Sequence, residues 1–239
     1  MRSVSTFKIP PFIAGIDRHI KYTQLTVEEA KDLWFVKWDN TYLFAMIKIA
    51  LTQITDLTED EFKKLTIQEA ITLLFYYRLK LFPTDKMDGN NNLPADYSKK
   101  LKNSLTDRTK TISVNGKSFT PFIPLDRAIE AEAHAIDSGR GHDVVYFLLG
   151  AGFISGGYAE GALHILNSPM DANTKSDLIA YNELIRQVSN INLSIYNGGD
   201  MYVKTPDDIR IKILSTPKGG NEPVSALNFQ EIFFFILNA

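Results

Sequence analysis

The chain of 239 residues contains no cysteine. Without a cysteine sulfur it forms no disulfide bond, thiolate zinc site, iron–sulfur cluster or cysteine nucleophile. The absence also fits a protein made in a reducing compartment. A chain of this length can bury a substantial core, either as one large domain or as two small ones.

A strong net charge is missing too. The formal charge is −2, which gives no overall attraction to nucleic acid or to an anionic membrane. Hydrophobic residues make up 44% and charged residues 23% of the chain, so wholesale disorder is not expected. We therefore expect a globular protein.

Long apolar runs are also missing. The longest, VVYFLLGAGFI and IFFFIL, are shorter than the roughly 20 residues that a membrane-spanning helix needs. The first 15 residues hold no continuous apolar stretch after Arg2, so we expect neither a signal peptide nor a membrane segment. The two apolar runs are interpreted as buried core or as interface.

The N-terminal third predicts a hairpin followed by a compact helical unit, residues 1–83. Two strands are expected within residues 7–22, around a turn at 15–17, with Pro10 and Pro11 confining the first strand to an edge or a bulge.

Three motifs in this unit place Thr at a helix start and Glu three residues later: Thr26–Glu29, Thr58–Glu61 and Thr66–Glu69. Each predicts a capping box, in which the two residues satisfy free backbone amides reciprocally. The third motif opens a long helix that Pro83 stops. Residues 41–54 are apolar nearly all round, which predicts a helix buried in the bundle.

Residues 84–110 are rich in Asn, Asp, Lys, Pro and Gly and predict an exposed linker, where the boundary falls if the chain is not one continuous domain. A basic arm for nucleic acid is the alternative. Asp96 and Asp107 dilute its charge, so composition favours the linker and nucleic acid is not expected as a partner. The basic residues concerned are Lys99, Lys100, Lys102, Arg108 and Lys110.

Residues 111–239 predict a hairpin, several helices and further strands. The hairpin turns at Asn115-Gly116, a dipeptide that suits a type I′ turn. Asp126 is expected to cap a helix through Ala135, and Asp143 to start another through Leu149. Further helices are predicted over 158–167 and 171–191, and strands over 201–205 and 209–214. The fold class predicted is α+β, mainly helical, with an N-terminal hairpin, a central β-hairpin and a C-terminal β segment.

One cluster of acidic residues and histidines offers a candidate for chemistry. Glu130 and His134 are spaced to share a helix face, but no HExxH motif, phosphate-binding loop or GxSxG elbow is present. A solvated acidic helix is the favoured reading, and we expect no metal, cofactor or catalytic residue. The alternative is an α+β enzyme with a site near His134, His142 and Asp143. The whole cluster consists of Glu130, Glu132, His134, Asp137, His142 and Asp143.

The C-terminus is unusually apolar. In a strand, neighbouring side chains point to opposite faces, so these residues cannot all meet one core. Two readings stay open: a central strand buried on both sides, or a contact with a partner. The candidate interface residues are Phe229, Ile232, Phe233, Phe234, Phe235 and Leu237, together with Ile236.

In its arrangement, the chain resembles the T-even-type phage baseplate hub family, which includes hub subunits and hub assembly chaperones. The segments that carry the likeness are IKYTQLTVEEAKDL, DLTEDEFKKLTIQEAITLLFYYRLKLF and the Phe-rich ending LNFQEIFFF. Some members carry a cysteine-pair module before the terminal aromatics, which this chain lacks, so a metal-stabilised version is excluded.

The resemblance implies a structural or assembly protein of a phage tail, not an enzyme, acting through protein–protein contacts. Its partners would be other tail or baseplate proteins, with no membrane involved. It would be found in the virion baseplate, or in the host cytoplasm during assembly. Whether it is a permanent component or a transient chaperone stays open.

Overall fold

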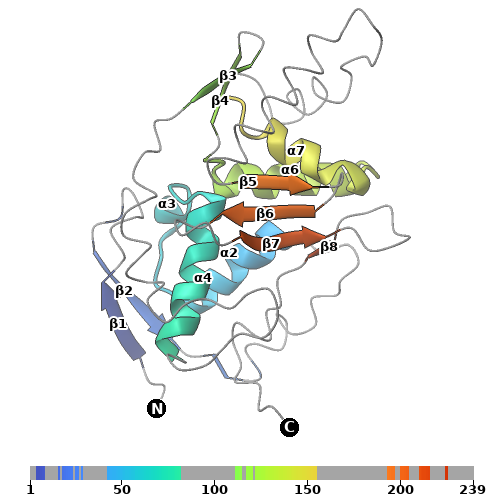
Figure 1. Ribbon diagram of the computed structural model, residues 1–239. Helices are drawn as coiled ribbons and strands as arrows, with labels where there is room; N and C mark the ends of the chain where they lie inside the picture. The colour runs from blue at the N-terminus through green and yellow to red at the C-terminus, as the bar shows by residue number, and fades with distance from the viewer. Residues whose placement is uncertain are drawn as a thin grey trace, which may run out of the picture.

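Figure 1 shows the computed structural model of the chain, which has an α+β fold that is mainly helical. The structure describes residues 4–8, 16, 18–23, 25–26, 28, 42–81, 111–114, 117–120, 122–154, 193–196, 200–204, 210–215 and 224–225. The helices are α2 Leu43–Ile54, α3 Glu59–Phe62, α4 Ile67–Leu81, α6 Leu125–Asp137, the 3-10 turn η3 Gly141–Asp143 and α7 Val144–Gly150. The strands are β1 Val4–Lys8, β2 His19–Thr23, β3 Ile112–Val114, β4 Lys117–Phe119, β5 Leu193–Tyr196, β6 Asp200–Lys204, β7 Arg210–Ser215 and β8 Val224–Ser225.

Helices α2, α4 and α6 form the centre of the described structure, and each contacts the other two. The first two turns of α4, residues 67–74, are buried on all sides. Helix α6 turns Ala128, Ala131 and Ala135 inward, and these small side chains let its neighbours approach closely. The long helix predicted from Thr66 is confirmed.

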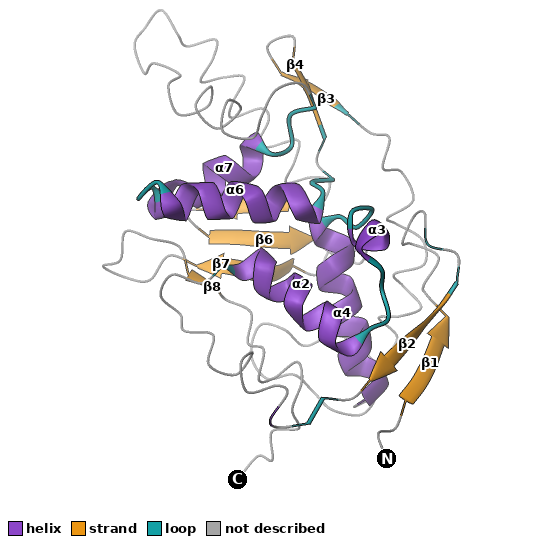
Figure 2. Cartoon of the chain, turned by 180° about the vertical axis from the view of Figure 1, so that it is seen from behind, coloured by secondary structure: helices purple, strands orange, loops and turns teal. Residues whose placement is uncertain are grey.

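An antiparallel sheet in the order β5-β6-β7-β8 lies against this helical layer. It stands in front of α2 and α6 in Figure 1 and behind them in Figure 2, so the two views agree on the layering. Ile213 and Leu214 of β7 point to opposite faces as neighbours in a strand, and both are buried in the common core. The C-terminal β segment is therefore confirmed, with β5 and β8 as strands that sequence reasoning had not predicted.

The N-terminal hairpin pairs β1 with β2. Its first strand covers Val4–Lys8, earlier than expected, and ends before Pro10 and Pro11, whose nitrogens carry no hydrogen for a ladder. Strand β2 alternates as a half-buried strand should, with Ile20 and Tyr22 inward.

The central hairpin pairs β3 with β4 as predicted, with Val114 opposite Lys117. The predicted turn at Asn115-Gly116 lies outside the described residues. Strand β4 also pairs on its other side: Thr120 N donates to Gly152 O at 2.7 Å, and Ile154 N donates to Ser118 O at 2.9 Å. A side chain at position 152 would meet the Phe119 ring and lie 2.8 Å from Thr120 O. Glycine is therefore needed there for close approach to the hairpin.

Two of the three predicted capping boxes are present. The backbone amide of Thr58 donates to Glu61 Oε2 at 2.8 Å, and that of Thr66 donates to Glu69 Oε2 at 2.8 Å. The hydroxyl of each Thr accepts the return bond from the amide of its glutamate. Glu29, the second residue of the pair Thr26–Glu29, lies outside the described residues, so this capping box stays a prediction.

The predicted cap of α6 was wrong. The helix begins at Leu125 after Pro124, which adopts the extended N-cap conformation and makes no side-chain cap. Asp126 thus falls in the first turn of the helix. Its carboxylate accepts a hydrogen bond from Lys48 of α2. Asp143 stands at the N-cap of α7 as predicted, but makes no side-chain capping bond. None of the described helices is long and apolar enough to cross a membrane.

Candidate functional site

An open groove of about 650 Å³ runs between α2, α3 and α6. Helix α2 supplies one wall, α6 the other, and α3 closes one side at Glu59. The residues lining it are Ala45, Lys48, Ile49, Thr52, Gln53, Glu59, Asp126, Ile129 and Glu130.

The sequence of α2 explains why this wall exists. Its groove residues recur at intervals of three and four, which puts them on one face of the helix. Ile49 lies on this face with 45% of its surface exposed. The prediction of a helix buried all round therefore holds for one side only. That buried side consists of Leu43, Phe44, Ile47, Ala50, Leu51 and Ile54.

Lys48 joins the three helices across the groove. Its Nζ donates to Glu59 Oε2 at 3.0 Å and to Asp126 Oδ1 at 3.2 Å, and it lies 5.7 Å from the centre of the Phe62 ring. Burial lowers the pKa of Lys48, but the hydrogen bonds to the two carboxylates outweigh burial and raise it above its ordinary value. The ammonium therefore stays charged and is held in place.

The rim of the groove carries more negative than positive charge. Among the described residues, three carboxylates and one ammonium line it, which sum to a charge of −2. Glu59 is 70% exposed at its side chain, and Glu130 is exposed on α6. Between these charges lie the apolar side chains of Ala45, Ile49 and Ile129. The described lining thus combines apolar side chains with an excess of carboxylates.

Glu132, two residues after Glu130, points into the protein instead. Its carboxylate accepts from the backbone amides of Leu43 at 2.8 Å and Phe44 at 2.9 Å, so it caps the N-terminus of α2, where no N-cap side chain does so. Burial raises the pKa of Glu132 to about 8, although bonds from the amides of α2 act in the opposite direction. Glu132 therefore holds α6 against the N-terminus of α2, the two helices that form the walls of the groove.

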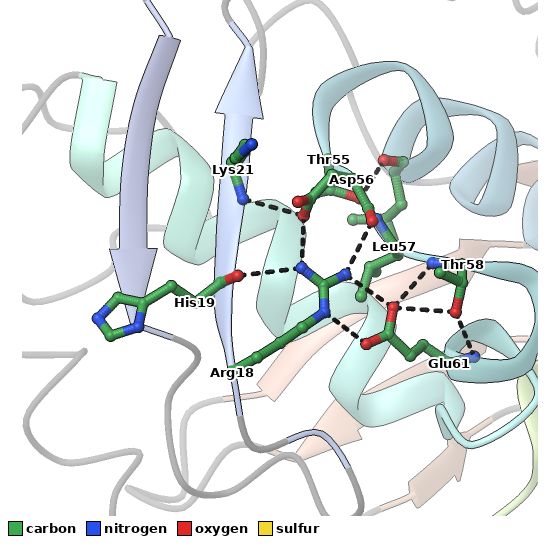
Figure 3. A network of polar contacts seen from close by, with 9 residues as sticks. Arg18, His19, Lys21, Thr55, Asp56, Leu57, Thr58 and Glu61 are labelled. Carbon is green, nitrogen blue, oxygen red and sulfur yellow. Dashed lines mark hydrogen bonds and ion pairs between the residues drawn. The ribbon is translucent and has the colours of Figure 1, made fainter.

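Arg18 fastens the N-terminal hairpin to the loop between α2 and α3 (Figure 3). Its Nε and Nη2 donate to the two oxygens of Glu61 at 2.6 and 2.8 Å. The other bonds go to Asp56 Oδ1 at 3.0 Å, Asp56 O at 2.8 Å and His19 O at 3.0 Å. All five guanidinium donors are therefore used. Asp56 Oδ1 also accepts from the Lys21 amide at 2.9 Å.

The clasp formed by Arg18, Asp56 and Glu61 fixes the far end of α2. The hydrogen bond from Arg18 is the main reason that the pKa of Glu61 falls to about 2. Sequence reasoning missed Arg18, because 43 residues separate it from Glu61 and no local pattern joins the two. Glu61 itself was found, but only as half of a capping box.

The acidic residues and histidines of the predicted cluster lie in different surroundings in the structure. Glu130 lies on the groove, Glu132 in the interior, and Asp137 accepts from the Tyr42 hydroxyl at 2.8 Å. His134 packs on the ring of Phe147 with the ring centres 5.4 Å apart. Within the described residues, no group of three or more such side chains is placed to hold a metal ion.

The residues of the alternative catalytic site form an ion-pair cluster. Asp143 Oδ2 accepts from Arg140 Nε at 2.9 Å and lies 2.8 Å from Nη2 of the same residue. His142 Nε2 is 3.4 Å from that oxygen. Arg140 also lies over the Phe147 ring. The Asp143 carboxylate is thus engaged by a guanidinium within the protein.

Two sets of predicted residues lie outside the described residues. The first is the basic cluster of residues 99–110. The second is the candidate C-terminal interface, Phe229, Ile232, Phe233, Phe234, Phe235 and Leu237. Both remain predictions.

Comparison of the chain with protein-family models, with curated proteins and with solved structures finds no match.

Proposed function

We propose that this protein acts by binding other proteins, without catalysis, and that the groove between α2 and α6 is a binding surface. The observation that carries the proposal is Ile49, an aliphatic side chain that is 45% exposed and lines an open groove. Burying its exposed part stabilises a complex by about 1 kcal/mol. An exposed apolar side chain among charged ones is common in protein–protein interfaces.

The assembly in which it acts is, on this proposal, a phage tail baseplate. The support is the resemblance in the order of hairpin, helical unit and Phe-rich ending to the baseplate hub family. The protein would be either a permanent part of the baseplate or an assembly chaperone. Mass spectrometry of purified virions separates these roles, because only a permanent part is retained in the finished particle.

Copurification tests the proposal. The tagged chain is expressed together with the tail proteins encoded in the same genome, as wild type, as Ile49→Asp and as Ile154→Asp. Ile154 is the matched control, since it is 54% exposed but does not line the groove. We expect tail proteins to copurify with wild type and Ile154→Asp but not with Ile49→Asp. If no tail protein copurifies with the wild-type chain, the proposed function is wrong.

A further inference from the structure

We infer that the groove takes a basic amphipathic helix of a partner protein, with its apolar face on Ile49 and its Lys or Arg side chains on the acidic rim. This inference rests on the proposed function and names the kind of partner. Two features of the groove carry it: the spacing of the residues on its walls and the excess of carboxylates at its edge.

The spacing fits a helix. From α2 the groove presents positions 45, 48, 49, 52 and 53, and from α6 positions 126, 129 and 130. Both sets follow intervals of three and four, so each wall is a row of side chains along one helix face. The channel between two such rows is where the ridge of a third helix packs. An added helix would meet the walls with residues at similar intervals.

The charge selects a basic partner. Lys48 is tied to Glu59 and Asp126, which leaves the rim with an excess of negative charge that includes the exposed Glu130. A Lys or Arg from the partner would bind there, whereas a carboxylate would meet like charge. An acidic segment, or a nucleic acid backbone, would be repelled by the same rim.

The test uses the full-length protein labelled with ¹⁵N and two helical peptides as probes, each roughly 18 residues long so that a helix can form. Both peptides carry the same Leu and Ala face, and they differ only in having Lys and Arg or Glu on the flanks of that face. Amide signals of residues 45–53 and 126–130 report binding in the groove.

We expect the basic peptide to shift these signals and to bind at least about tenfold more tightly than the acidic one. Salt at about 0.5 M should reduce the difference. Ile49→Asp should abolish binding at the groove, while Ile154→Asp should not affect it. Glu130→Lys should reduce the preference for the basic peptide by several-fold, because it replaces a rim carboxylate by an ammonium.

The outcomes separate this inference from the proposed function. Equal affinity for both peptides, preference for the acidic one, or no groove shifts with either peptide overturns the inference. The proposed function then stands or falls by copurification. If Ile49→Asp still loses its tail proteins, the groove is a docking site for a partner of different chemistry. If it retains them, the groove itself is excluded as the docking site.

Discussion

The Arg18 clasp and the groove around Lys48 are built from similar parts but differ in what they leave exposed. In each, one cation binds two carboxylates from segments distant in the sequence. Arg18 uses all five of its donors within the protein, and the Glu61 side chain is only 14% exposed. Around Lys48, one carboxylate is largely exposed and a further one, Glu130, belongs to the same rim.

The difference indicates separate roles for the loop that follows α2 and for the exposed face of α2. The clasp completes its interactions internally, which is what a contact that stabilises the fold requires. The groove combines apolar side chains with an excess of exposed carboxylates, as a surface for a partner does. Substitutions in the clasp should therefore affect stability, and substitutions in the groove should affect binding.

The largest effect on stability is expected at α6, where Glu132 caps α2 in the interior and Glu130 lies on the exposed groove. Glu132→Ala should lower the free energy of unfolding by about 3 kcal/mol, because two buried backbone amides of α2 then lose their acceptor. Glu130→Ala, on the exposed face of α6, should change it by less than about 0.5 kcal/mol. Urea unfolding measures both. Equal effects would mean that Glu132 is not a cap.

The pH dependence of stability sharpens this contrast. The pKa of Glu132 is about 8 in the folded protein and 4.5 as its ordinary value, so between these limits the folded chain keeps a proton that the unfolded chain has lost. Stability from this group should thus be greatest below pH 4.5 and should fall as pH rises towards 8, on the order of 1 kcal/mol per pH unit. The observable is the difference between wild type and Glu132→Gln in urea unfolding at several pH values. A difference that stays constant from pH 5 to 8 would show that Glu132 does not titrate there.

Next in size are the two cations. Arg18→Met should cost about 2 kcal/mol, a value that allows for screening because the Arg18 side chain is 35% exposed. Lys48→Met should cost less than about 1 kcal/mol, because its partner Glu59 is mostly exposed. Thermal unfolding of both variants measures the two losses of stability. A larger loss for Lys48→Met than for Arg18→Met would reverse the assignment of the two regions.

A small effect on stability is also expected at Ile49. Ile49→Asp should change the free energy of unfolding by about 1 kcal/mol at most, because 45% of the Ile49 surface is already exposed. Circular dichroism during thermal unfolding measures this. A loss of several kcal/mol would place Ile49 in the folding core, and its effect on binding would then have no independent meaning.

Local chemistry made part of the fold predictable. The capping boxes at Thr58 and Thr66 and the pairing of β3 with β4 depend on residues within a few positions of one another. The start of α6 was missed by two residues because Pro124 took the N-cap position in place of Asp126.

The site depends on contacts that no local pattern contains. Glu130 and Glu132 have the same side chain and lie two positions apart, so only the position of α2 decides which is a cap and which lines the groove. Arg18 finds its partners 38 and 43 residues away. The apolar pattern of residues 41–54 located the helix but not its open side, because Ile49 is as apolar as its buried neighbours.

Site-specific photo-crosslinking tests the central claim most directly. A photoreactive amino acid replaces Thr52, an exposed residue of the groove, or Ser118, an exposed residue of β4 that does not line it. The labelled chain is produced in cells that assemble the tail. We predict a crosslink from position 52 to a tail protein and none from position 118. Crosslinks to a tail protein from position 118 but not from position 52 would contradict the assignment of the groove as the binding surface.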